Sequence, residues 1–216
     1  MINDKSKFCA DISKWQNDFD YVNYAKMGFK NLIIKAGQGT VQKYKTWFIQ
    51  NYIKATQSGL YVIPYWFVDK SSKIDNQIIE FEDRLNYLKI YNPIAIDYEA
   101  VNTVSGDKSV DVQDVMFFID YFQKKGYKVI LYSVESFLNS KGVGFQDFKA
   151  DYIWASAVGK NKPFVFDDVI DLNFETAVNQ YVKVKCDIWQ FTWKMQGIHS
   201  TPIDFNFIFN EKIFNF

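Results

Sequence analysis

Short apolar runs alternate along this chain with longer segments that carry apolar residues at helical spacing. Three longer segments, at 47–59, 73–90 and 111–126, each place apolar side chains on one stripe and predict helices. The alternation indicates βα units around a mainly parallel sheet, and eight runs predict a closed barrel. The runs expected to form strands are 7–13, 31–37, 61–68, 93–99, 128–133, 152–157, 186–192 and 201–207.

The pattern changes after residue 157, where the links between apolar runs become short or irregular. The segment 159–168 predicts a loop and the segment 192–202 a hairpin-like link, with His199 exposed on it. We therefore predict one α/β, TIM-like barrel over residues 1–216, in which helices follow the first five strands and not the last three. No separate cell-wall-binding domain is expected.

Charge and composition exclude several classes of protein. The chain has 25 basic and 25 acidic residues, so it has no electrostatic footprint of a nucleic-acid binder. No segment predicts a membrane span or a signal peptide, which indicates synthesis in a cytoplasm. One histidine and two separated cysteines predict no zinc site, and we expect neither metal nor cofactor.

Candidate chemistry lies in the run "AIDYEA" at 95–100, where a buried strand leads into two acids. Asp97 and Glu99 are two residues apart, so they share one face of the strand, about 6.5 Å apart along the chain. Two carboxylates in one pocket titrate at different pH values, which separates an acid from a base, as glycoside hydrolysis requires. Solvated acids paired with lysines would give the same pattern.

Two further acids favour the functional interpretation. Asp11 ends the first predicted strand and Asp204 lies in the last one. The first and last strands are neighbours in a closed barrel, so four acids from three strands are predicted to converge on one mouth. Mg²⁺ or Ca²⁺ could bind such a cluster, but no glycine-rich phosphate loop accompanies it.

Eight short motifs then occur in the order found in the family 25 glycoside hydrolases, and the chain resembles that family over nearly its whole length. The motifs are "ADISKWQ" (10–16), "IIKAGQGT" (33–40), "YWF" (65–67), "AIDYEA" (95–100), "ILYS" (130–133), "YIWAS" (152–156), "WQFT" (189–192) and "IDFN" (203–206).

The resemblance implies a (β/α)5(β)3 barrel and a lysozyme, an N-acetylmuramidase that cuts the β-1,4 bond between N-acetylmuramic acid and N-acetylglucosamine in peptidoglycan. It implies that Glu99 is the general acid/base, Asp97 its partner, and Asp11 and Asp204 flanking acids. The positions that the resemblance places along the sugar groove are Lys35, Tyr65, Trp66, Tyr132, Trp154 and Gln190.

Two positions depart from the family pattern: Gln38 stands where the family has glutamate, and Trp66 where it has histidine. Trp66 either stacks on a sugar or packs outward under a helix. In the expected mechanism Glu99 protonates the leaving oxygen while Asp97 assists attack by the substrate's own acetamido group. An inverting route, with a water activated by an aspartate, stays open.

Two rival functions use the same barrel: a chitinase-like hydrolase of N-acetylglucosamine polymers, and a non-catalytic wall-binding or virion protein. The longer acidic motif of chitinases is absent, because Ala95 stands two residues before Asp97. The expected partner is the glycan strand of peptidoglycan, bound by a monomer. The expected setting is a phage or prophage lysin, made in the host cytoplasm and acting on the wall after holin-type release or from the virion.

Overall fold

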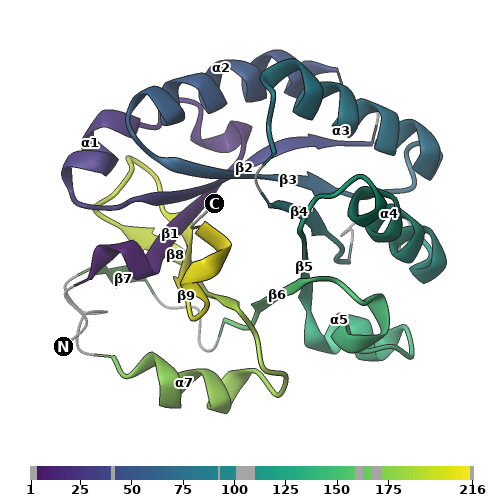
Figure 1. Cartoon of the computed structure of the whole chain (residues 1–216). Helices are drawn as coiled ribbons and strands as arrows, with labels where there is room; N and C mark the ends of the chain where they lie inside the picture. Colours follow the sequence, from purple (N-terminus) through teal and green to yellow (C-terminus); the bar gives the residue numbers. More distant parts are fainter. Residues whose placement is uncertain are drawn as a thin grey trace.

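The structure is a computed structural model that describes residues 4–39, 42–91, 93–100, 110–158, 163–166 and 172–214. Its centre is a sheet that closes on itself, with helices around the outside (Figure 1). The strands are β1 (Phe8–Ile12), β2 (Asn31–Gln38), β3 (Tyr61–Phe67), β4 (Ile94–Asp97), β5 (Val129–Val134), β6 (Tyr152–Ser156), β7 (Phe164–Val165), β8 (Ile188–Gln196) and β9 (Ile203–Ile208). The helices are α1 (Tyr21–Lys26), α2 (Lys43–Gln57), α3 (Ile74–Leu88), α4 (Val112–Lys124), α5 (Glu135–Ser140) and α7 (Phe174–Tyr181), with short 3-10 turns η1 (Lys5–Lys7), η2 (Lys14–Gln16), η3 (Phe145–Phe148) and η4 (Glu211–Phe214).

Strand pairing closes the barrel. The strands follow one another in the order β6-β5-β4-β3-β2-β1-β9-β8, and pairing of β6 with β8 completes the ring. All neighbours around the ring are parallel except β9, which runs antiparallel to both β1 and β8. The predicted TIM-like α/β barrel is confirmed, and so is the hairpin-like link between its last two strands.

One prediction about the second half of the chain is wrong. The helix α7 follows β6 and β7, in the region where no helix was expected. Asn173 caps its start by accepting a hydrogen bond from the Thr176 amide, and Phe174 stacks on Phe207 with ring centroids 4.3 Å apart. A helix of 8 residues held by a single buried residue has too short an apolar stripe to be recognised by periodicity.

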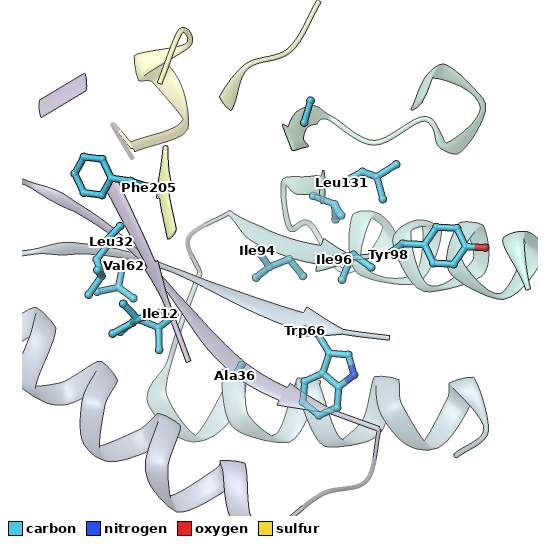
Figure 2. Packing of buried hydrophobic residues seen from close by; sticks show 14 of the residues in the cluster. Ile12, Leu32, Ala36, Val62, Trp66, Ile94, Ile96, Tyr98, Leu131 and Phe205 are labelled. Carbon is cyan, nitrogen blue, oxygen red and sulfur yellow. The ribbon is translucent and has the colours of Figure 1, made fainter. Parts of the chain in front are cut away.

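The alternation of side chains along each strand separates two apolar regions. Residues that point into the barrel pack with one another, and residues that point outward pack against the helices. In β4, for example, Ala95 points inward, whereas Ile94, Ile96 and Tyr98 lie in the outer core (Figure 2). The face occupied by Ala95 is therefore the one that carries Asp97, as the sequence predicted.

Trp66 lies on the outer face of β3, so of the two places predicted for it, packing under a helix is confirmed and the place in the sugar groove is wrong. Figure 2 shows the indole directed from the sheet toward the helices. The ring is fully buried, lies 5.2 Å from Phe81 between centroids, and donates a hydrogen bond to Gln77. The guanidinium of Arg84 lies 4.8 Å from the ring centroid. Trp66 is one residue from the inward-facing Tyr65, so strand alternation sends it to the opposite side.

Gly37 is the residue that makes room for this packing. A Cβ atom at position 37 would overlap the ring of Trp66 and the guanidinium of Arg84. Arg84 is itself fully buried and donates to the carbonyl of Ala36. The absence of a side chain at position 37 and the large ring at position 66 are thus two parts of one packing arrangement.

We expect Gly37→Ala to destabilise the fold by about 1–3 kcal/mol, because a methyl group is forced into a filled site. The measurement is urea unfolding of four proteins: wild type, Gly37→Ala, Trp66→His and the double variant. The smaller imidazole leaves space for the methyl group, so the double variant should lose less than the sum of the single losses. Strictly additive losses would contradict the arrangement.

Candidate active site

The four predicted acids meet at one mouth of the barrel. Asp97 is the last residue of β4, and Glu99 follows two residues later. Asp11 and Asp204 stand directly opposite each other in the pairing of β1 with β9. Because β9 runs antiparallel, its beginning lies where the parallel strands end, which brings Asp204 to the same mouth.

Burial dominates the electrostatics of these acids. Loss of hydration disfavours the charged form, and it raises the pKa of Glu99 to about 7 and that of Asp204 to about 8. Burial also raises the pKa of Asp97 well above its usual value, and the charge of neighbouring Glu99 adds to the effect. The cluster therefore holds protons at neutral pH, as a general acid must.

Asp97 also offers an acceptor to a ligand. Its Oδ1 atom is buried and has no hydrogen-bond partner within the described part of the chain. A buried carboxylate oxygen without a donor is costly, so a ligand N–H that reached it would gain a strong hydrogen bond.

Lys35 brings a positive charge into the site. It lies on β2 and is buried beside Asp97 and Glu99, so burial lowers its pKa while the two acids act in the opposite direction. Rings of Tyr44, Tyr65 and Phe67 surround the ammonium group, with the nearest centroid, that of Phe67, at 4.5 Å. The positive charge lowers the pKa of Glu99 and so partly offsets the effect of burial.

Gln38 links this lysine to a buried acid on the loop after β3. The Lys35 ammonium donates to Gln38 Oε1 at 2.9 Å, and Gln38 Nε2 donates to Asp69 Oδ2 at 2.8 Å. The amide can accept from the cation and donate to the carboxylate at the same time, which a glutamate carboxylate cannot do. At the position where the family pattern has glutamate, Gln38 therefore makes one hydrogen bond to Lys35 and another to Asp69.

Asp11 is held by two side-chain amides. Its Oδ2 atom accepts from Gln190 Nε2 at 3.0 Å and from Asn206 Nδ2 at 2.8 Å. Burial raises the pKa of Asp11 to about 6, and these two donors act against that rise by favouring the charged form. Among the four acids, Asp11 is thus the one whose charge the surrounding protein supports most directly.

An aromatic layer forms the floor beneath the acids. Tyr132 donates to Gln190 Oε1 at 2.8 Å, and Trp154 Nε1 donates to Asn206 Oδ1 at 2.7 Å. Tyr65 meets Trp154 edge-on at 6.3 Å between ring centroids. The three rings and Gln190 are buried in the barrel, so they support the acid cluster from below. Direct contact of these predicted groove residues, and of Lys35, with a sugar stays a prediction.

Asn206 was not singled out by the sequence, although a signal for it was present. It stands two residues after Asp204 in β9 and therefore points into the barrel with it. Its amide binds three groups at once: Asp11, Trp154 and the carbonyl of Cys9. A single polar residue thus joins the acid cluster to the aromatic floor.

We expect Asn206→Ala to destabilise the protein by about 1–3 kcal/mol, because buried groups lose their partner. Without the amide, Asp11 is harder to ionise, so a pH–activity profile that needs its charged form should have its acidic limb shifted to higher pH. Asn179→Ala on exposed α7 is the matched control. An unchanged profile together with normal stability would contradict the role of Asn206.

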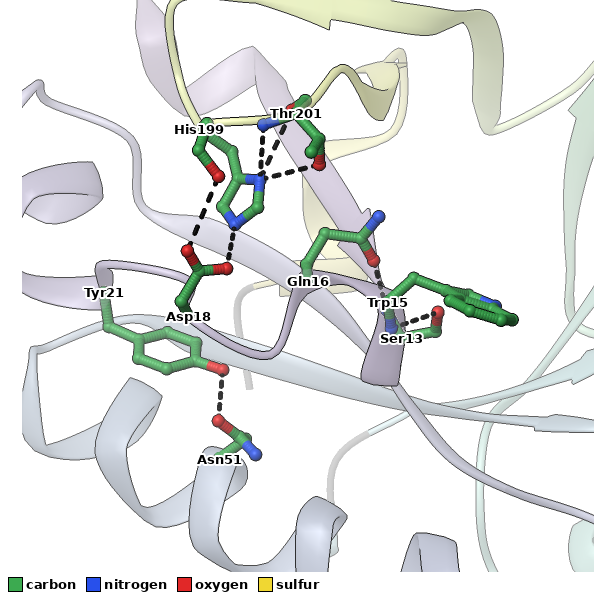
Figure 3. Close-up of polar contacts among 9 residues, drawn as sticks. Ser13, Trp15, Gln16, Asp18, Tyr21, Asn51, His199 and Thr201 are labelled. Atoms are coloured by element: carbon green, nitrogen blue, oxygen red, sulfur yellow. Dashed lines mark hydrogen bonds and ion pairs between the residues drawn. The ribbon is translucent and has the colours of Figure 1, made fainter.

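His199 joins two segments near the mouth and is not exposed as predicted. Its side chain is 3% exposed and stacks on Phe19 with ring centroids 5.9 Å apart. Its Nε2 lies 2.9 Å from Asp18 Oδ1, and its Nδ1 contacts Thr201 (Figure 3). The contact joins the link between β8 and β9 to the segment after β1. The strands β1 and β8 are the two neighbours of β9 in the barrel.

Several other features of the described residues bear on the chemistry. A groove of about 720 Å³ lies along α1, Lys30 and the end of α2 and contains none of the four acids. Within the described ranges, no group of three or more His, Cys, Asp or Glu side chains is placed to hold a metal ion. No helix in those ranges is long and apolar enough to cross a bilayer.

Glu99 is a carboxyl group that is protonated near neutrality, and a second carboxyl group, Asp97, lies next to it at the mouth of a βα barrel. This arrangement is typical of the active site of a glycoside hydrolase. The family model of glycosyl hydrolases family 25 matches residues 10–198, and the chain belongs to this family. Asp204 and Asn206 lie beyond the matched range, but the register of β9 and the bond from Asn206 to Asp11 place them in the same site.

Solved structures share the whole fold. The chain is similar to the catalytic domain of endolysin ply40 from bacteriophage P40 of Listeria monocytogenes, with 23% identity, a TM-score of 0.72, and coverage of 96% of this chain and 95% of that one. It is similar to a family 25 glycosyl hydrolase from Bacillus anthracis, with 25% identity, a TM-score of 0.69, and coverage of 97% and 92%. A bacterial lysozyme from Streptomyces coelicolor matches at 19% identity and a TM-score of 0.72, with 96% of each chain covered. The comparison with curated proteins finds no match.

Proposed function

We propose that this family 25 enzyme is a peptidoglycan hydrolase of the lysozyme type, an N-acetylmuramidase that cuts the β-1,4 bond from N-acetylmuramic acid to N-acetylglucosamine. The observation that carries the proposal is the pairing of Glu99, whose pKa burial raises to about 7, with the buried Asp97 at the barrel mouth. Similarity to a phage endolysin domain and to a bacterial lysozyme supports the choice of substrate.

In the proposed mechanism, protonated Glu99 donates its proton to the glycosidic oxygen as the bond to the anomeric carbon breaks. The carbonyl oxygen of the substrate's acetamido group forms a new bond to that carbon, and Asp97 accepts a hydrogen bond from the acetamido N–H. Water then attacks the anomeric carbon, gives a proton back to Glu99, and restores the acetamido group. The Oδ1 of Asp97, which has no hydrogen-bond partner among the residues that the structure describes, supports this role.

The decisive experiment is mass spectrometry of the fragments released from a defined peptidoglycan. A muramidase releases fragments with muramic acid at the reducing end. Fragments that end in N-acetylglucosamine, or release of chitobiose from chitin, would favour the chitinase-like alternative. Binding to the wall with no fall in turbidity would favour the non-catalytic one. Release in ¹⁸O-labelled water, with the anomer identified at early times, separates retention from inversion.

The proposed setting follows from the same similarity. We place the enzyme among phage or prophage lysins, acting on the wall as a monomer after holin-type release or from the virion. Its catalytic barrel resembles that of a phage endolysin along 96% of this chain. Lysis from within by the enzyme co-expressed with a holin, compared with addition of the enzyme from outside, tests this setting.

A further inference from the structure

A second pocket opens beside the acids, at the carboxyl ends of β5 and β6. Its volume is about 430 Å³, within the usual size of small-ligand sites. Besides Val134, Ala157 and Val158, its lining comes from polar and aromatic residues: Glu135, Ser136, Asn139, Ser156, Tyr181, Lys183 and Trp193.

Gln190 connects this pocket to the acid cluster. Its Oε1 atom accepts from Ser156 at 2.7 Å and from Trp193 Nε1 at 2.9 Å, and both donors line the pocket. Its Nε2 atom donates to Asp11. One buried side-chain amide is thus bonded both to two residues that line the pocket and to Asp11 of the acid cluster, which places the pocket next to the acids.

Trp193 presents a fixed aromatic surface to the pocket. The hydrogen bond from its Nε1 holds the edge of the indole, while 43% of the residue remains exposed. An indole fixed by its N–H and open on its carbon surface suits a ligand with both apolar and polar sides, as a sugar ring has. Asn139 and Ser136 add an amide and a hydroxyl, which can bind hydroxyl and acetamido groups.

The charges of the pocket favour a neutral ligand. Among the described residues, one acid, Glu135, and one base, Lys183, line it, and the carboxylate of Glu135 accepts a hydrogen bond from the Lys183 backbone amide. Such a balance selects neither an anion nor a cation. A stem peptide of the wall carries free carboxylates, and it would bind more tightly to a pocket with an excess of positive charge.

We propose that this pocket is a further glycan subsite, in which Trp193 stacks on an N-acetylated hexosamine unit of the strand whose bond is cut at Glu99. The inference rests on the proposed function for its substrate. The pocket would give the enzyme a preference for longer strands, because only these fill it while their scissile bond lies at the acids.

The test compares Trp193→Ala, Trp193→Phe and the control Tyr91→Ala on glycan strands from which an amidase has removed the peptides. Tyr91 is an exposed aromatic residue that precedes β4, at the barrel end opposite the mouth. Loss of stacking in Trp193→Ala should raise KM about tenfold. Trp193→Phe keeps a ring but loses the bond to Gln190, so its KM should stay near that of wild type. The control should change neither constant.

Equal KM values for wild type and Trp193→Ala would overturn the subsite, and so would an effect seen on peptide-bearing strands but not on peptide-free ones. A fall in kcat shared by the Ala and Phe variants, with KM unchanged in both, would also overturn it and would assign Trp193 to positioning Gln190. Calorimetric titration of peptide-free strands into Glu99→Gln and Glu99→Gln/Trp193→Ala keeps this test separate from the proposed reaction. Tighter binding by the first protein supports the subsite even if the cleaved bond is different, and equal binding refutes it.

Discussion

Replacing Glu99 with glutamine is expected to lower kcat on purified wall by about 10³-fold, because the amide keeps the shape of the side chain but has no proton to give. KM should change little, since the remaining contacts with the strand are retained. The wild-type rate should fall as the pH rises through about 7, where burial places the pKa of Glu99 and the acid loses its proton.

Turbidity loss, fragment analysis and thermal unfolding on the same preparations provide the measurement. Glu175→Gln on exposed α7 makes the same chemical change away from the mouth and should keep wild-type activity. If Glu99→Gln turned over wall within a few-fold of wild type while still folded, Glu99 could not be the acid. We expect a smaller loss for Asp11→Asn, because Asp11 acts on its neighbours and not on the leaving group.

The second large effect concerns stability as well as rate. We expect Asp97→Asn to lower kcat by about 10²-fold or more and to raise Tm at pH 8 by about 5 °C. Burial raises the pKa of Asp97 well above its unfolded value, so the folded state binds the extra proton more tightly. The stability that this proton provides is complete below the unfolded pKa, near 4, and is lost as the pH rises through the folded value.

The difference in Tm between Asp97→Asn and wild type should therefore be small at pH 5 and grow toward pH 8. Asp120→Asn, a surface change in an exposed ion pair with Lys124, serves as the control and should show little difference at either pH. A variant that is less stable than wild type at pH 8 would mean that Asp97 is charged there and well compensated by Lys35. That result would refute the expectation that Asp97 lowers the stability of the protein at pH 8 while it raises the catalytic rate.

The sequence was sufficient for most of the barrel and for the acids. Short apolar runs between the helical segments located the strands. Alternation of side chains along a strand then fixed which face of β4 carries Asp97, because Ala95 and Ile96 belong to different environments. Closure of the predicted barrel made the last strand the neighbour of the first. The antiparallel direction of β9 agrees with the predicted hairpin-like link.

The errors came from contacts that a linear pattern does not contain. Trp66 was assigned to the groove by its motif, although its neighbour Tyr65 already occupied the inward face. Its place under α3 depends on the space at Gly37 and on Arg84, which is 47 residues away from Gly37 in the sequence. Likewise, the burial of His199 depends on Phe19 and Asp18, which no local signal connects with it.

The pairing of β1 with β9 also affects when the enzyme can become active during synthesis. The hydrogen bond from Asn206 to Asp11 joins residues 195 positions apart, so the site has very high contact order. Asp11, Asp97 and Glu99 leave the ribosome well before Asp204 and Asn206, and until these arrive the ring of strands cannot close. A nascent or truncated chain that ends before β9 should therefore be unable to hydrolyse peptidoglycan, since hydrolytic activity appears only with the final strand.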